Sequence, residues 1–108
     1  MTDVLFVYGT LRRGWDNPYA RQLGSEADWL GPATVRGSLV RNGPYLGYRP
    51  EPDGIVEGEL WRLHSPEGAF LFLDDYEGPD YTRAVVQSIS ESGPCDAWIY
   101  LYKDYAAA

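Results

Sequence analysis

The chain has 108 residues, which fits one domain and leaves little room for two, so we expect residues 1–108 to form a single domain. Hydrophobic residues make up 44% and charged residues 23% of the chain, the composition of a globular protein and not of a disordered one. The formal net charge of −7 repels phosphate backbones and anionic lipids, which argues against nucleic acid and membranes as partners.

Strands are predicted from short runs of β-branched and aromatic residues that end at turn residues. Six runs fit this pattern: residues 4–8, 33–41, 45–49, 55–63, 81–90 and 96–102. The first run is apolar throughout, so we expect it to be buried and to lead into a turn at Gly9. The last two runs are predicted to be joined by a turn at Gly93-Pro94.

Two helices are predicted from their start and stop signals. Asn17-Pro18 is a typical helix start and indicates a short helix over roughly residues 18–29. A second helix starts at Ser65-Pro66, carries apolar residues at the helical period and ends at Gly78. These elements lack the alternating order of a doubly wound parallel sheet. The sequence therefore predicts an α+β fold, a small mixed but mostly antiparallel β-barrel with about two short helices.

The N-terminal segment predicts a protein that stays in the cytoplasm. It has an acidic residue, Asp3, where a secretory signal would be basic, and its apolar run stops at Gly9. No apolar run approaches the ~20 residues that a membrane-spanning helix needs. The single cysteine, Cys95, cannot form an intrachain disulfide, in agreement with a reducing compartment.

The first candidate site is Tyr8-Gly9-Thr10-Leu11, directly after the first predicted strand. A glycine there lets the backbone turn and point several N–H groups into one space, where they can bind an anion or a developing oxyanion. The glycine spacing of residues 9–14 invites comparison with a phosphate-binding loop, but Trp15 and Asp16 stand where that loop requires lysine and a hydroxyl residue. Taken alone, the segment is more typical of an ordinary strand-ending turn.

The second candidate site is Glu77, at the end of the second predicted helix and flanked by Tyr76 and Tyr81. A carboxylate among aromatic rings loses part of its hydration, which raises its pKa toward neutrality and suits acid/base catalysis. A solvated glutamate at a helix end is the commoner interpretation of such a residue.

Neither a metal site nor a cofactor is expected. Asp74, Asp75 and Glu77 are hard oxygen ligands, but the adjacent Asp74 and Asp75 point to different sides of a helix. The only cysteine and the only histidine, Cys95 and His64, cannot build a usual zinc site. No serine lies in a nucleophile motif, so covalent catalysis has little support.

Together, the two candidate segments resemble the γ-glutamylcyclotransferase-like family, and especially its compact γ-glutamylamine cyclotransferase-like, or AIG2-like, branch. The resemblance covers most of the chain, from about Val4 to Tyr102. Its matching residues are Tyr8-Gly9-Thr10-Leu11 and Leu73-Asp74-Asp75-Tyr76-Glu77-Gly78, with Tyr81 and Arg83. The resemblance implies a small mixed barrel whose cavity holds the active site, with the Tyr8–Leu11 loop cradling the glutamyl group of a small substrate and Glu77 as general acid/base.

The same resemblance implies an intramolecular reaction. The α-amine of a γ-glutamyl substrate attacks its own γ-amide carbonyl, and 5-oxoproline and an amine or amino acid are released. Ring closure needs neither a protein nucleophile nor a cofactor, which agrees with the residues present. Arg83 either pairs with a substrate carboxylate or is a cross-strand surface residue, and Tyr102 is a weak candidate for a hydroxyl in the cavity. The sequence indicates neither the leaving amine nor the oligomeric state.

Two other functions fit the same residues. A non-catalytic module would use the cavity to hold a small ligand or a peptide end, although such a binder has no need of a carboxylate at Glu77. A biosynthetic enzyme would use the same chemistry to cut a γ-glutamyl protecting group from a larger amine.

Overall fold

A computed structural model describes residues 2–9, 11–43 and 45–103 of the chain. It contains seven strands and two helices in these ranges, one strand more than predicted. In chain order they are β1 (Val4–Val7), α1 (Pro18–Glu26), β2 (Ala27–Arg36), β3 (Ser38–Asn42), β4 (Tyr45–Arg49), β5 (Ile55–Leu63), α2 (Pro66–Glu77), β6 (Tyr81–Ser90) and β7 (Gly93–Tyr102).

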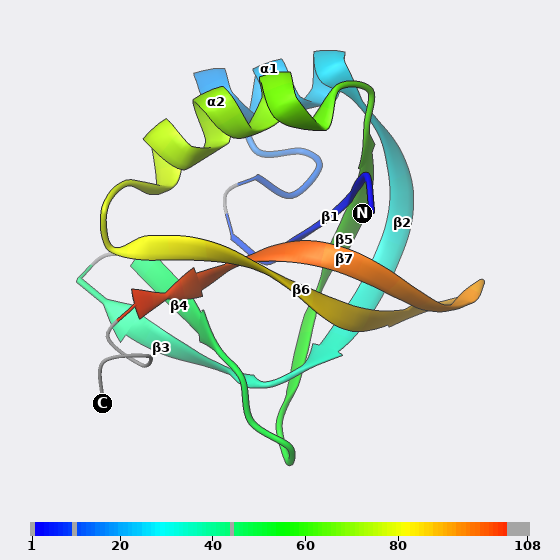
Figure 1. Cartoon of the computed structure of the whole chain (residues 1–108), viewed down its shortest axis with the longest axis vertical. Helices are drawn as coiled ribbons and strands as arrows, with labels where there is room; N and C mark the ends of the chain where they lie inside the picture. The colour runs from blue at the N-terminus through cyan, green and yellow to red at the C-terminus, as the bar shows by residue number, and fades with distance from the viewer. Residues whose placement is uncertain (1, 10, 44, 104–108) are drawn as a thin grey trace.

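Five of the strands close into a mixed barrel (Figure 1). Their order is β1-β5-β2-β6-β7, and β7 returns to β1 to complete the circle. Neighbouring strands run antiparallel except at that closure, where β1 and β7 are parallel and Leu5 lies opposite Trp98. The antiparallel pair β3–β4 joins from outside through a parallel contact between β4 and the end of β7, at Tyr48 and Leu101. The predicted mostly antiparallel barrel is confirmed.

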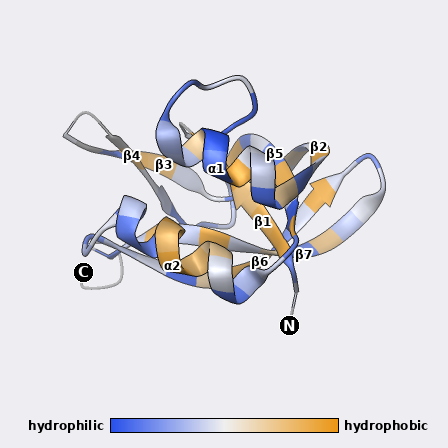
Figure 2. Ribbon diagram, turned by 90° about the horizontal axis from the view of Figure 1, so that it is seen from above, coloured by the Kyte–Doolittle hydropathy of each residue, from blue (hydrophilic) through white to orange (hydrophobic). Residues whose placement is uncertain are grey.

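The strand β1 is buried on both of its faces. Its side chains alternate between the barrel interior, which receives Val4 and Phe6, and the cluster under the two helices, which receives Leu5 and Val7. Figure 2, seen from the helix side, shows this hydrophobic strand between α1 and α2. The continuous apolar run in the sequence is explained by this double burial.

The helix α2 places the predicted catalytic residue at the rim of the barrel. Ala69, Phe70 and Leu73 form its buried face, as their helical spacing predicted. The helix ends at Glu77 because Gly78 adopts a φ of +81°, and the Gly78 N–H donates to the Asp74 carbonyl at 3.0 Å. Within the described residues, neither helix is both long and apolar enough to cross a membrane.

The strand predicted over residues 33–41 is two strands, separated at Gly37. Gly37 has a φ of +148°, and a Cβ at this position would lie 2.4 Å from the Tyr48 ring and 2.7 Å from the Arg49 carbonyl oxygen. Only glycine fits such a corner, where the chain leaves the closed barrel for the outer β3–β4 pair.

Two other boundaries differ from the prediction. The first helix ends at Glu26 and not near residue 29, because the chain pairs with β5 from Ala27 onward, opposite Leu63. The turn predicted at Gly93-Pro94 was placed too late, since β7 already begins at Gly93, opposite Ser90. In both places strand pairing decides the boundary, and local turn signals do not.

Candidate active site

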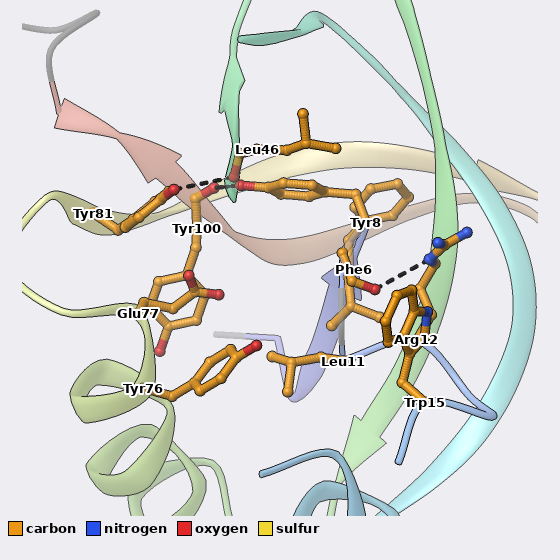
Figure 3. Close-up of a pocket in the computed structure, with 12 residues that line it drawn as sticks. Phe6, Tyr8, Leu11, Arg12, Trp15, Leu46, Tyr76, Glu77, Tyr81 and Tyr100 are labelled. Carbon is orange, nitrogen blue, oxygen red and sulfur yellow. Dashed lines mark hydrogen bonds between the residues drawn. The ribbon is translucent and has the colours of Figure 1, made fainter. Parts of the chain in front are cut away.

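A cavity of about 390 Å³ opens between the barrel and the C-terminal end of α2 (Figure 3). Its walls come from β1 and the following loop, from β4, from the end of α2 and from β6 and β7. The lining residues are Phe6, Val7, Tyr8, Gly9, Leu11, Arg12, Trp15, Leu46, Tyr76, Glu77, Tyr81 and Tyr100. A concave, mostly aromatic and aliphatic space of this size suits a small ligand.

Glu77 is the last residue of α2, and its side chain projects into this cavity (Figure 3). Burial raises the pKa of its carboxyl group from 4.5 to about 7. Within the described part of the chain, no donor is hydrogen-bonded to this carboxylate, and burial is the cause of its raised pKa. The carboxyl group can therefore both accept and release a proton near neutral pH.

Tyr8 lines the cavity with its ring and uses its hydroxyl to hold the wall together. The hydroxyl donates to the Tyr100 carbonyl oxygen of β7 at 2.8 Å and accepts from the Tyr48 N–H of β4 at 3.0 Å. Burial, and next the nearby Glu77 charge, raise the pKa of Tyr8, so the hydroxyl stays protonated. The Tyr8 hydroxyl therefore links β4 to β7 behind the cavity wall.

Tyr100 forms another wall, and its hydroxyl is directed to Asp74. It donates to the Asp74 carboxylate at 2.6 Å, and Arg83 binds the same carboxylate through two nitrogens at 2.8 and 3.1 Å. Burial alone would raise the pKa of Asp74, but the hydrogen bonds from Arg83 and Tyr100 outweigh it and lower that pKa. Asp74 is thus ionised at neutral pH and holds Tyr100 in place.

Arg83 faces a second, more polar hollow of about 360 Å³ and not the cavity that contains Glu77. Its guanidinium lies 4.0 Å from the centre of the Phe70 ring and is paired with Asp74. In the structure Arg83 of β6 therefore forms an ion pair with Asp74 of α2, and a contact between Arg83 and a substrate carboxylate stays a prediction.

The loop after β1 brings backbone to the cavity, as the sequence suggested. The Arg12 N–H donates to the Gly9 carbonyl oxygen at 3.2 Å, which closes a turn, and Leu11 is buried against the core. Gly9 does not have a positive φ, and a Cβ at this position would meet nothing within 4 Å. The fold itself does not require glycine here, whereas close approach of a ligand to the backbone would. Thr10 lies outside the described residues.

Several lining residues were missed by sequence reasoning. Tyr100 lies in the cavity wall, whereas Tyr102, the weak candidate from the sequence, is not among the described lining residues and packs against the Tyr81 ring at 5.7 Å. Tyr100 and Tyr102 lie on the same face of β7, and it is the Tyr100 hydroxyl that reaches α2, at Asp74. Trp15 and Leu46 carried no signal in the sequence, because their places in the cavity wall depend on how a loop and the strand β4 lie against the barrel.

The residues considered for metal binding are dispersed. His64 contacts Asp28 at 3.0 Å on the surface, and Cys95 lies on β7. In residues 2–9, 11–43 and 45–103, no three His, Cys, Asp or Glu side chains are close enough to hold a metal ion.

The sequence matches a family model described as "Gamma-glutamyl cyclotransferase, AIG2-like" over residues 5–108. The chain therefore belongs to the AIG2-like gamma-glutamyl cyclotransferase family, and the resemblance predicted from the two motifs is confirmed. The chain is 28% identical to the Drosophila melanogaster protein CG2811, which is named as a gamma-glutamylcyclotransferase. That alignment covers 97% of this chain and 73% of the relative.

Two solved structures share the fold of this chain, and their sequences are about equally similar to it. The crystal structure of YkqA from Bacillus subtilis has a TM-score of 0.77 and 27% identity, over 94% of this chain. The chain spans only 36% of YkqA. The crystal structure of an AIG2-like protein from Mus musculus has a TM-score of 0.74 and 26% identity, over 95% of this chain and 78% of the mouse protein. These likenesses confirm the predicted fold.

Proposed function

We propose that this protein is a γ-glutamyl cyclotransferase that acts as a single domain and uses Glu77 as its general acid/base. The observation that carries the proposal is a carboxylate with a pKa of about 7 in an aromatic cavity, in a chain that belongs to this family. Its substrate is a small molecule with a free α-amine and a γ-amide.

The reaction forms one bond and breaks one. The substrate's α-nitrogen attacks its own γ-carbonyl carbon, and the bond from that carbon to the leaving nitrogen breaks. Glu77 accepts a proton from the attacking nitrogen and returns one to the leaving nitrogen, so the carboxylate ends in its starting state. The products are 5-oxoproline and a free amine, and no water is consumed.

The pKa of Glu77 is suited to both proton transfers. A carboxyl group with a pKa of about 7 is present in both protonation states at neutral pH, which is the best condition for an acid that must also act as a base. General acid/base catalysis of this kind typically supplies ~10²–10⁴ in rate. An exposed glutamate with an ordinary pKa would be almost wholly ionised at neutral pH, so it would have no proton to give to the leaving nitrogen.

The cavity walls supply orientation. A γ-glutamyl chain must curl before its amine reaches its carbonyl, and holding that geometry is worth up to roughly 7–11 kcal/mol. Leu11, Phe6 and Tyr76 offer apolar surface that can hold the methylene groups and exclude water. The backbone at Gly9 and Leu11 can offer N–H groups to the substrate carboxylate or the oxyanion, and a role for Thr10 remains a prediction.

The test is detection of 5-oxoproline by mass spectrometry after incubation with γ-glutamyl amines, γ-glutamyl amino acids and glutathione. We expect product with the wild type and none with Glu77→Gln, which keeps the size of the side chain. Glu57→Gln is the matched control, because Glu57 is exposed on β5 and does not line the cavity. Comparable turnover by Glu77→Gln would remove the acid/base role, and ligand binding without any product would favour a binding module.

A further inference from the structure

The end of α2 that carries Glu77 is joined to the barrel by a polar cluster of Asp74, Arg83 and Tyr100. Asp74 of α2 accepts two hydrogen bonds from Arg83 of β6, at 2.8 and 3.1 Å, and one from the Tyr100 hydroxyl of β7, at 2.6 Å. One carboxylate thereby connects the helix to two strands. Glu77 follows Asp74 by three residues, which places both side chains on one face of the helix.

The Arg83 guanidinium contacts this face of α2 at a second point. It lies 4.0 Å from the centre of the Phe70 ring, and Phe70 precedes Asp74 by four residues. Phe70, Asp74 and Glu77 therefore follow one another along one side of the helix. A single arginine on β6 contacts the first two of these residues, and the third is the carboxylate in the cavity.

The chain turns sharply between Glu77 and β6. Gly78 has a φ of +81°, the Tyr81 N–H donates to the Gly78 carbonyl oxygen at 3.3 Å, and β6 begins at Tyr81. Arg83 reaches back across this turn to the helix that precedes it. The turn ends the helix, whereas the contacts of Arg83 hold the last helical turn against the barrel and so decide how far Glu77 projects into the cavity.

Tyr100 lies between the polar cluster and the cavity. Its ring lines the cavity that contains Glu77, while its hydroxyl donates to Asp74. The second hollow shares Tyr81 and Tyr100 with the cavity, and Arg83 lines only that hollow. Burial, and next the hydrogen bond to Asp74, raise the pKa of Tyr100, so its hydroxyl stays protonated and continues to donate at neutral pH.

The exposure of the ion pair favours a positioning role over a role in stability. The side chains of Arg83 and Asp74 are 30% and 48% exposed, and ion pairs this open to water contribute little to the free energy of unfolding. The planar guanidinium, bound through two nitrogens and stacked on a ring, nevertheless has a defined direction. The pair therefore fixes where the end of the helix lies.

We propose that Arg83 is a positioning residue for the reaction, which acts through Asp74 and Tyr100 to hold the end of α2 so that Glu77 stays buried in the cavity. This inference rests on the proposed function, because it concerns the same general acid/base. Loss of the ion pair should admit water to the Glu77 carboxylate and move it away from the reacting nitrogens.

The ionisation of Glu77 can be followed separately from the activity. Glu77 is the only carboxyl group among the described residues that line the cavity. The other ionisable or charged side chains that face it come from the segment after β1 and from α2, β6 and β7, and they are Tyr8, Arg12, Tyr76, Tyr81 and Tyr100. Carbon-13 NMR of the glutamate carboxyl groups therefore reports the burial of Glu77, and its signal is identified by its absence from Glu77→Gln.

Two charge-neutral double variants make a matched comparison. Asp74→Asn/Arg83→Gln removes the proposed pair, and Asp3→Asn/Arg62→Gln removes an exposed pair of β5 and the N-terminal segment, which does not line the cavity. Each removes one positive and one negative charge, so a difference between them reflects burial and not net charge. We expect the first to lower the Glu77 pKa from about 7 by about one unit or more toward 4.5, and the control to leave it unchanged.

The kinetic prediction separates positioning from substrate binding. Arg83→Gln should lower kcat for 5-oxoproline release by about 10–100-fold and leave KM close to the wild-type value, because a displacement of about 1 Å can cost ~10²-fold in rate. Arg83→Lys should recover part of kcat, since it restores the charge beside Asp74 but not the contact through two nitrogens. Arg62→Gln should keep the wild-type kcat and KM.

The outcomes distinguish this inference from the proposed function. Circular dichroism checks that each variant is folded, and Arg83→Lys, which keeps both charges, replaces the double variant in the NMR titration if that variant does not fold. A Glu77 pKa that stays at the wild-type value would overturn the positioning role, and so would a raised KM with unchanged kcat in Arg83→Gln, which would make Arg83 a substrate-binding residue. Absence of 5-oxoproline with the wild type would overturn the proposed function, while the NMR titration would still decide whether the ion pair keeps Glu77 buried.

Discussion

Replacing Glu77 by glutamine should stabilise the fold at neutral and alkaline pH while it abolishes turnover. The pKa of Glu77 is about 7 in the fold and 4.5 in an open chain. Below pH 4.5 the group is protonated in both states and contributes nothing. As pH rises above 4.5 the unfolded chain loses this proton first, so the folded state loses relative stability until Glu77 also ionises near pH 7.

The magnitude follows from the same two values. A pKa of about 7 against 4.5 corresponds to roughly 3 kcal/mol of lost stability above pH 7. Residual solvent contact of the side chain lowers this figure, so we expect roughly 1–3 kcal/mol. Glutamine keeps the shape of the protonated acid but does not titrate, and it therefore recovers this stability.

Urea unfolding at a series of pH values measures the effect. The free energy of unfolding of Glu77→Gln minus that of the wild type should be small at pH 5, grow through pH 6 and 7, and level off near pH 8. Glu57→Gln, on the exposed side of β5, should show no such trend. A difference for Glu77→Gln that does not vary with pH would refute the reasoning, because it would mean that the carboxylate is solvated and has an ordinary pKa.

Two further variants test the framework of the cavity. Gly9→Ala should keep the wild-type unfolding midpoint and lose at least about tenfold in kcat/KM, because its Cβ enters open cavity space and meets no protein atom; loss of stability instead would make Gly9 a structural residue. Tyr8→Phe should lose about 1–3 kcal/mol in urea unfolding, and the Tyr48 amide should exchange hydrogen faster, because the hydroxyl joins β4 to β7. An unchanged hydrogen-exchange rate at the Tyr48 amide would show that β4 and β7 stay paired without the Tyr8 hydroxyl.

The barrel could be predicted because its main signals are local. The apolar run of β1, the start of α2 at Ser65-Pro66 and its end at Gly78 each follow from the residues present. The split at Gly37 could not be predicted, because its cause is the Tyr48 ring and the Arg49 carbonyl on a strand that comes later in the chain. Such a contact exists only once the fold has formed.

The candidate site divides in the same way. Glu77 could be predicted from its place at a helix end between two tyrosines, and the structure places it in the cavity with the raised pKa expected for it. Arg12, which lines the cavity, directly follows the Tyr8–Leu11 segment, and the sequence had singled out that segment only for its backbone. Leu46 is brought to the cavity by the parallel contact between β4 and β7, which no local pattern indicates, and Trp15 comes from a loop without a sequence signal of its own.

The most direct test of the central claim is the fate of water in the reaction. The best γ-glutamyl substrate is converted in water labelled with oxygen-18, and the products are identified by mass spectrometry. Intramolecular attack with Glu77 predicts 5-oxoproline without the label, together with the free leaving amine, and neither product with Glu77→Gln. Glutamate that carries oxygen-18 would contradict the account, because it would show that water, and not the substrate's own amine, attacks the γ-carbonyl.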